Sequence, residues 1–317
     1  MRRAFLQRFA AGTLILGLGL PAFADKPVHY IVPAPPGGLI DTMARLVGPG
    51  LTESLKESIV IENRPGANTV LGANLVAQAE PDGHTWLAVS STLAANNGLP
   101  GATFDSEALL KPVARLAVTP MGVVVPANSP YHSLQELVTA AKKGTILNVG
   151  SSGSGTPPHL ALALFQRETS TQQTHVPYKG GAPSLMDLIG GRLDVVFSTL
   201  SESNGFIKGG KLRLLAVMSE ERLADYPDVP TTAEADLPNL LMAGWTGIMV
   251  PIATPKATVQ KISDAAVALT NDPAFVKKAE QLGFVVPSQG TDEFSKFYKS
   301  EMDRMRVLIK EQDIRID

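Results

Sequence analysis

Two glycine-rich loops are the segments of this chain whose residues could bind an anion. One spans residues 35–38 (Pro-Pro-Gly-Gly) and the other residues 150–156 (Gly-Ser-Ser-Gly-Ser-Gly-Thr), and each lies between an expected strand and an expected helix. A ligand can approach glycine backbone closely because glycine has no Cβ. The first N–H groups of a helix carry a positive partial charge and lack intrahelical partners, so they can hold a carboxylate or phosphate without a charged side chain. The alternative is that both loops are ordinary strand-to-helix turns capped by water.

Patterns typical of enzymes are incomplete in this sequence. Residues 150–156 resemble a phosphate-binding loop, but Thr156 stands where that loop requires lysine. No Gly-x-Ser-x-Gly elbow occurs, and the histidines at positions 29, 84, 132, 159 and 175 lack metal-site spacing. His159 could act as a base for Ser152 or Ser154, although its expected place in a first helical turn favours a structural role. The sequence therefore predicts no catalytic residue, no metal and no cofactor.

The overall composition excludes further classes of function. The chain has 317 residues, with 28 Lys and Arg against 30 Asp and Glu and a formal net charge of −2. A nucleic-acid-binding protein needs a basic patch to displace phosphate counterions, and this balance argues against one. With no cysteine, the chain forms no disulfide and has no thiol nucleophile. Its length is sufficient for about two domains.

The N-terminal segment has the features of a secretory signal peptide. Arg2, Arg3 and Arg8 precede an apolar stretch at residues 9–20, and residues 22–24 (Ala-Phe-Ala) fit the small-x-small rule before a cleavage site. A membrane anchor is the alternative, but the apolar stretch is shorter than the roughly 20 residues that a spanning helix needs. The sequence predicts that residues 1–24 are removed and that the protein acts in a periplasm, after export by the Sec or the twin-arginine route.

The remaining chain alternates expected strands with expected helices, which predicts α/β architecture with right-handed parallel connections. Apolar runs suggest strands at 29–32, 58–62, 86–89, 122–125, 146–150, 175–178, 193–197, 212–217 and 245–250. Ile40, Met43, Ala44 and Val47 should form the inner face of the first helix, and residues 48–50 (Gly-Pro-Gly) should break or kink it. We predict two lobes, one of residues 25–122 and 248–317 and the other of residues 123–247.

Several segments of the chain resemble motifs of the Bug receptors, the extracytoplasmic solute-binding proteins of tripartite tricarboxylate transporters. They are residues 31–45 (IVPAPPGGLIDTMAR), 60–67 (VIENRPGA), 81–85 (PDGHT), 152–160 (SGSGTPPHL), 175–180 (HVPYKG) and 228–231 (DVPT). Together with the terminal helices, they extend the resemblance over essentially the whole chain after residue 24.

The resemblance implies a two-lobed periplasmic-binding-protein fold of the Venus flytrap type (type II), which closes on a small organic carboxylate. It also implies delivery of that ligand to an integral-membrane permease with a large and a small subunit, by a receptor expected to be a monomer. Two other functions stay open on the sequence: a sensory binding protein of a signalling system, and a hydrolase or transferase on the same fold.

By match to the family motifs, the ligand-binding residues expected on one lobe are Pro36, Gly37, Gly38 and Asp41. Those expected on the other lobe are Ser152, Ser154, Thr156, Tyr178 and Gly180. Ser90, Ser91 and Thr92 end a strand at the same edge and are further candidates. Asp41 also stands four residues before Arg45, so an ion pair within the helix is the alternative to ligand contact.

Three departures from the family pattern bear on the identity of the ligand. Ala34 stands where the family usually has Phe, and residues 68–70 (Asn-Thr-Val) replace the usual glycine pair and its neighbour. Ser198, which we include among the ligand contacts, stands where the family commonly has Asp or Asn. Because Ser198 is neutral and Ala34 lacks a ring, we expect a carboxylate ligand without an α-ammonium group.

Overall fold

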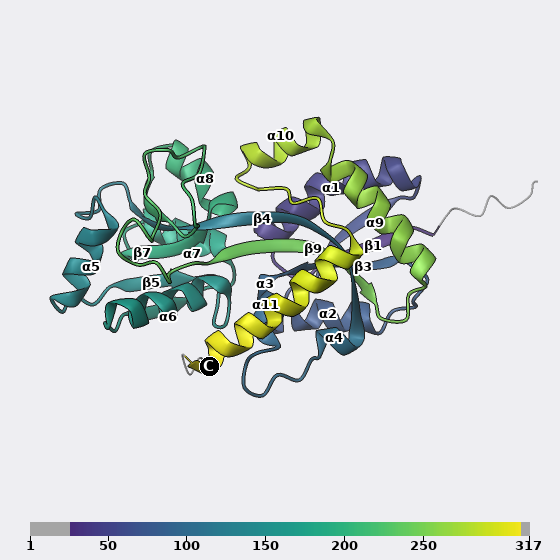
Figure 1. The fold of residues 1–317 in the computed structure, drawn as a ribbon, viewed down its shortest axis with the longest axis horizontal. Coiled ribbons are helices and arrows are strands. Elements are labelled where there is room, and N and C mark those ends of the chain that lie inside the picture. The colour runs from purple at the N-terminus through teal and green to yellow at the C-terminus, as the bar shows by residue number, and fades with distance from the viewer. Residues whose placement is uncertain (1–25, 312–317) are drawn as a thin grey trace, which may run out of the picture.

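A single long strand, β4 (Leu110–Pro126), runs through both lobes of the protein (Figure 1). In the computed structural model, which describes residues 26–311, the first part of β4 pairs with β9 (Ala243–Pro251), and the part from Met121 onward pairs with β7 (Val195–Thr199) and β8 (Leu212–Val217). The β4–β9 register is irregular next to Pro112. Proline has no backbone N–H, and at such an irregularity its absence does not break a regular series of hydrogen bonds between the strands. β4 therefore connects the sheets of the two lobes.

The other strands pair in parallel on either side of this connection. They are β1 (Val28–Val32), β2 (Ile59–Asn63), β3 (Thr85–Ser90), β5 (Asn148–Ser151) and β6 (Thr174–Pro177). β1 pairs with β2 and β3 in the first lobe, and β5 pairs with β6 and β7 in the second. The complete order is β2-β1-β3-β9-β4-β7-β5-β6, with β8 paired to β4. The expected parallel α/β units are confirmed, and antiparallel β4 and β9 join them.

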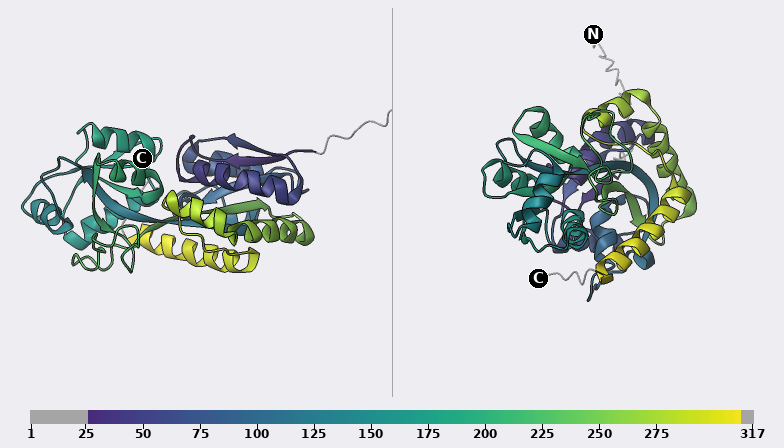
Figure 2. Two further views of the ribbon diagram at one scale, coloured as in Figure 1. Left: turned by 90° about the horizontal axis from the view of Figure 1, so that it is seen from above. Right: turned by 60° about the vertical axis from the view of Figure 1, so that its left-hand side comes forward.

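Helices cover both faces of the sheet in each lobe (Figure 2). Those of the first lobe are α1 (Leu39–Leu55), α2 (Val70–Ala77), α3 (Ser91–Asn96), α4 (Ser106–Leu109), α9 (Lys256–Thr270), α10 (Pro273–Gln281) and α11 (Thr291–Glu311), with a short 3-10 turn, η1 (Ala67–Thr69). Those of the second lobe are α5 (Leu134–Lys142), α6 (Pro157–Thr169), α7 (Gly181–Ile189) and α8 (Leu200–Lys208). Among residues 26–311, none of these helices combines the length and the apolar character that crossing a membrane requires.

Alternation along the strands divides the apolar side chains between the two faces of each sheet. In the first lobe, Tyr30 and Trp86 pack with α1 and α9, whereas Ile31 and Leu87 pack on the opposite side with α2, α3 and α11. In the second lobe, Phe197 faces the core that includes α5 and α6, while residues on the other side of β7 face α7 and α8. Sheets buried on both faces explain why the strands read as continuous apolar runs.

The first helix confirms one expectation and contradicts another. Its predicted inner face is buried, but α1 continues through Pro49 to Leu55, so the expected break is wrong. Pro49 lies on the exposed side of α1, where water can bond to the carbonyl group that proline leaves without a donor. On the buried side, Leu51 and Leu55 continue the apolar face and hold the last turns against the core.

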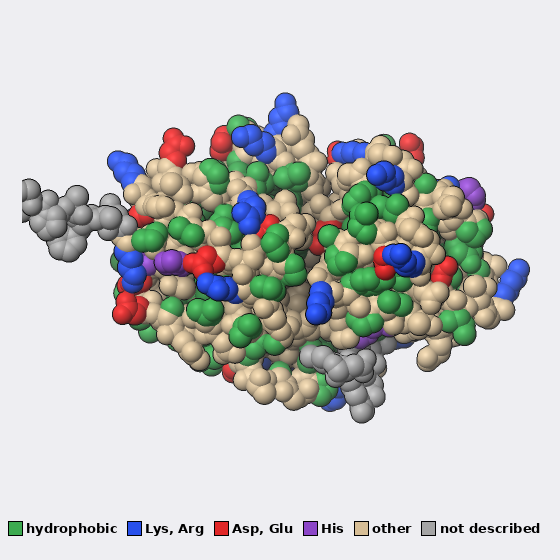
Figure 3. All heavy atoms as spheres, turned by 180° about the vertical axis from the view of Figure 1, so that it is seen from behind, with side chains coloured by type: hydrophobic (Ala, Val, Ile, Leu, Met, Phe, Trp, Pro, Cys, Tyr) green, Lys and Arg blue, Asp and Glu red, His purple; other side chains and the backbone are tan. Residues whose placement is uncertain are grey.

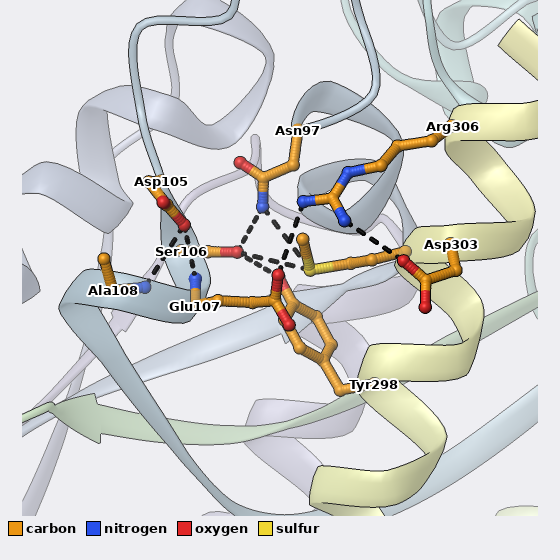
Figure 4. Close-up of polar contacts among 9 residues, drawn as sticks. Asn97, Asp105, Ser106, Glu107, Ala108, Tyr298, Asp303 and Arg306 are labelled. Carbon is orange, nitrogen blue, oxygen red and sulfur yellow. Dashed lines mark hydrogen bonds and ion pairs between the residues drawn. The ribbon is translucent and has the colours of Figure 1, made fainter.

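The last helix, α11, joins the two lobes. Figure 4 shows its Tyr298 beside Ser106, whose hydroxyl lies 2.6 Å from that of Tyr298, and its Arg306 paired with Glu107 and Asp303. Its last turns, through Met305, Leu308 and Ile309, belong to an apolar cluster that contains Ala95 and Leu99 of the first lobe together with residues of α5 and α6 of the second. α11 is therefore packed against both lobes.

Two expectations about the chain's organisation remain predictions. The expected signal peptide, residues 1–24, lies outside the described residues. The expected lobe boundaries at 122/123 and 247/248 fall within β4 and β9, the two strands that lie side by side where the lobes meet.

Candidate ligand-binding site

A cavity of about 560 Å³ lies between the two lobes. The first lobe lines it with residues 33–36, 38–40, 65–69 and 90–92, the second with residues 152–153, 156–158, 178–183, 199 and 202, and β9 with Gly244. The volume is within the range of about 300–1,000 Å³ that is usual for small-molecule sites. Figure 3 shows a furrow between the lobes on one face of the molecule, with charged side chains scattered over both lobes.

On the first lobe, the loop before α1 is held by a buried carboxylate. The Gly37 N–H donates to Asp41 Oδ2 (2.9 Å), Arg45 Nε donates to the same oxygen (3.0 Å), and Asn63 Nδ2 donates to Asp41 Oδ1 (2.8 Å). Burial raises the pKa of Asp41, but these hydrogen bonds outweigh it, and the pKa lies below its ordinary value. Gly37 has a φ of +85°, which favours glycine. Asp41 therefore fixes the shape of the loop from behind the cavity wall.

On the second lobe, the loop before α6 is held by its own side chains. Thr156 is the N-cap residue of α6, but its hydroxyl donates to the Gly153 carbonyl oxygen (2.6 Å) and caps no helical N–H. The Gly155 N–H donates to His159 Nδ1 (2.9 Å), and the His159 ring stacks on His175. His159 therefore positions the glycine-rich loop, in line with the structural role that the sequence favours.

The third wall of the cavity is the turn before α7. The Gly180 N–H donates to the Ser152 carbonyl oxygen (3.2 Å), and Gly180 has a φ of +115°. Tyr178 contributes to the lining, while its hydroxyl donates to Asp187 (2.8 Å). Burial, with the Asp187 hydrogen bond, raises the pKa of Tyr178. α7 then begins at Gly181 with no side chain capping its first N–H groups.

Most of the residues expected from the sequence line this cavity. Those that do are Pro36, Gly38, Ser90, Ser91, Thr92, Ser152, Thr156, Tyr178 and Gly180. The structure does not bring Gly37, Asp41, Ser154 or Ser198 to the lining. Ser198 is buried and donates to the Thr199 carbonyl oxygen. Its neutral side chain therefore does not bear on the charge of the ligand, and that part of the reason for expecting no α-ammonium group no longer holds, whereas Ala34 does line the cavity.

Asn68 is a cavity residue that we did not assign from the sequence. Its side-chain nitrogen donates to the Ser154 carbonyl oxygen, which links the first lobe to the second. Its own carbonyl oxygen accepts a hydrogen bond from Asn96. Residues 67–69 all have positive φ values without being glycine, and asparagine tolerates this region better than most residues. The signal in the sequence was the replacement of the usual glycine pair at this point.

Glu202 is the second residue that we did not assign. It is half-buried on the first turn of α8, where its carboxylate accepts hydrogen bonds from the Thr199 hydroxyl (3.0 Å) and from the Leu39 N–H at the start of α1. Burial raises the pKa of Glu202, and the two hydrogen bonds offset part of that effect. The spacing Thr199-x-x-Glu202 is that of a capping box. In a sequence it indicates the start of α8 and gives no sign of a cavity residue.

The chain matches a known family over most of its length. Residues 43–314 match the family described as tripartite tricarboxylate transporter family receptor. The chain belongs to this receptor family. Protein BugT of Bordetella pertussis is 33% identical to it over 253 residues, which are 77% of this chain and 77% of BugT. The expected Bug-type receptor is confirmed.

Solved structures of this receptor family extend the comparison to the fold. A Rhodopseudomonas palustris protein solved with adipate has a TM-score of 0.88 and 29% identity, over 92% of this chain and 98% of its own. MatC from Rhodopseudomonas palustris with bound malate has a TM-score of 0.84 and 29% identity, over 89% of this chain and 98% of its own. These similarities confirm the two-lobed α/β receptor fold. Within residues 26–311, no group of three or more His, Asp or Glu side chains is arranged to hold a metal ion.

Proposed function

We propose that this receptor captures a small organic carboxylate between its lobes and presents it to a permease with a large and a small membrane subunit. The observation that carries the proposal is the cavity between the lobes, where the N-terminal ends of α1, α6 and α7 meet. The family match supports transport, and malate and adipate in similar structures support a carboxylate ligand.

The cavity suits an anion that is bound mainly by backbone groups and hydroxyls. Within the described part of the chain, Lys179 is the only cationic residue among those that line it, and Lys179 is exposed. The start of α7 after Gly180, which has no capping side chain, and the hydroxyl of Ser152 supply neutral donors. A few charge-assisted hydrogen bonds of about 1.5–3 kcal/mol each are enough for micromolar binding, about −8 kcal/mol.

Binding is expected to be reversible, stoichiometric and coupled to closure of the lobes. The first test is a thermal-shift screen of the purified protein against mono-, di- and tricarboxylates, followed by calorimetry on the compounds that raise the melting temperature. Small-angle scattering should then show a smaller radius of gyration with the ligand bound. Recovery of a chemically altered ligand after incubation would contradict a receptor role.

The site of action is part of the same proposal. We infer that residues 1–24 direct export and that the mature receptor begins at Asp25 and works as a monomer in the periplasm. Intact-mass measurement of protein released from the periplasm should give a chain that starts at Asp25. Full-length protein retained in the inner membrane would contradict this proposal.

A further inference from the structure

The cavity contains one acidic side chain that reaches from one lobe to the other. Glu202 belongs to α8 of the second lobe, yet its carboxylate accepts a hydrogen bond from the backbone of Leu39, the first residue of α1 in the first lobe. Among the residues that line the cavity in the described part of the chain, Glu202 is the only acidic one. The electrostatics of this end of the cavity therefore depend on one side chain.

Two glycines make room for the Glu202 carboxylate. A Cβ on Gly181, the first residue of α7, would overlap it, and a Cβ on Gly38 would lie 3.4 Å from Oε1. The carboxylate thus lies between the starts of α1 and α7, where the N-cap residues are glycines that supply no capping side chain of their own. Carboxylates are stabilised at such helix starts. Glu202 already fills the position that a second ligand carboxylate would need.

No basic side chain neutralises this carboxylate. Within residues 26–311, Glu202 forms no ion pair with Lys or Arg, and its hydrogen-bond donors are the Thr199 hydroxyl and the Leu39 N–H. An ionised carboxylate can accept about four hydrogen bonds. The remaining capacity of Glu202 is available to a ligand group that donates hydrogen bonds, and a cationic group there would favour the charged form of Glu202. A second carboxylate would find the Thr199 and Leu39 donors occupied.

We propose that Glu202 determines the ligand class. The ligand has one carboxylate, and it has an ammonium group at the end that faces Glu202. Compounds with carboxylates at both ends are rejected. This inference rests on the proposed function and refines it. The carboxylate of the ligand would lie at the loop before α6, which lines the cavity with Ser152 and Gly153. The adipate and malate in similar structures have carboxylates at both ends, so the inference separates this receptor from those relatives.

The test uses sets of ligands that have the same length and differ only at one end. Calorimetry would compare adipate, hexanoate and 6-aminohexanoate, and likewise the corresponding four- and five-carbon sets, on three proteins. These are the wild type, Glu202→Gln, which removes the charge and keeps the shape, and Glu220→Gln, which removes an exposed charge of the same lobe outside the cavity.

The measured quantity is the ratio of affinities for the ammonium carboxylate and the dicarboxylate of equal length. We expect a ratio of at least ten in the wild type and in Glu220→Gln, and a ratio at least tenfold lower in Glu202→Gln. A ratio within one protein does not depend on the fraction that is folded. A wild-type preference for the dicarboxylate, or an unchanged ratio in Glu202→Gln, overturns the role of Glu202 while leaving the receptor function intact. Failure of the wild type and Glu202→Gln to bind any of these carboxylates, or any in the thermal-shift screen, overturns the proposed function and this inference with it.

Discussion

Replacement of Asp41 by asparagine should destabilise the protein, although Asp41 lies outside the cavity lining. The substitution keeps the shape of the side chain and the acceptor for Asn63, but it turns an NH₂ group toward the Gly37 N–H and Arg45 Nε, which both donate to Asp41 Oδ2. The Asp41 side chain is 4% exposed, whereas that of Arg45 is 52% exposed. Gly37 is itself exposed, so it is the buried Asp41 carboxylate that keeps water from replacing this bond.

The magnitude follows from these two lost hydrogen bonds. A bond from a partly buried N–H to a charged acceptor contributes about 1.5–3 kcal/mol, and an exposed i,i+4 ion pair adds only about 0.3–0.5 kcal/mol. We expect Asp41→Asn to lower the free energy of unfolding by about 2–3 kcal/mol, measured by urea denaturation at pH 7. Asp303→Asn is the matched control, because the Asp303–Arg306 pair is exposed on both sides, and it should cost less than about 1 kcal/mol.

The pH dependence supplies a second check on the role of Asp41. Its pKa in the folded protein is below the ordinary value of 3.8, so the folded state favours the charged form. The stabilisation is complete above about pH 4 and is lost as the pH falls through the lowered pKa. The difference between wild type and Asp41→Asn should therefore shrink at lower pH. A variant within about 0.5 kcal/mol of wild type at pH 7 would refute the argument that Asp41 holds the loop.

Three further predictions concern residues that line the cavity. Gly181→Ala should push the Glu202 carboxylate, the end of a flexible side chain, away from the Leu39 N–H, so the free energy of unfolding should fall by about 0.5–1.5 kcal/mol, the value of one hydrogen bond. Gly205→Ala, which meets open space, should not lower it. Burial raises the pKa of Glu202 above its ordinary value of 4.5, so ionisation of Glu202 should lower the melting temperature of the wild type as the pH rises above about 4.5. Glu202→Gln should lack this decrease, and parallel pH profiles of the two proteins would count against the prediction. Asn68→Gly allows the same positive φ but removes the hydrogen bond that joins the first lobe to Ser154 of the second. Because this bond stabilises the closed conformation, ligand affinity should fall about fivefold, roughly 1 kcal/mol. Unchanged affinity in calorimetry would show that the bond does not contribute to closure.

The sequence was sufficient for the architecture because local periodicity and burial agree along most of the chain. The first helix illustrates this, since Ile40, Met43, Ala44 and Val47 recur at helical spacing and are all buried. The same helix shows where local rules fail. Pro49 predicts a break, but packing of the following turns against the core outweighs its local cost.

The cavity was predictable where backbone shape decides the site and unpredictable where a side chain crosses between lobes. The loops before α1 and α6 were identified from their glycines, and both line the cavity. Glu202 was missed because its spacing from Thr199 indicates a helix cap, and only the meeting of α8 with α1 turns that side chain into a contact between lobes. Asp41 was assigned to ligand contact by its motif, whereas the structure uses it to hold Gly37.

The position of α11 has a consequence for how affinity is set. Because Met305 and Leu308 of its last turns share an apolar cluster with residues of both lobes, while Tyr298 is anchored in the first, separating the lobes must disturb an apolar contact of this cluster outside the ligand cavity. Such a contact contributes to the population of the closed conformation before any ligand arrives. Apparent affinity scales with that population, so substitutions in the last turns of α11 can strengthen or weaken binding while every ligand contact stays the same. The receptor can therefore be tuned to the concentration of its ligand independently of its selectivity.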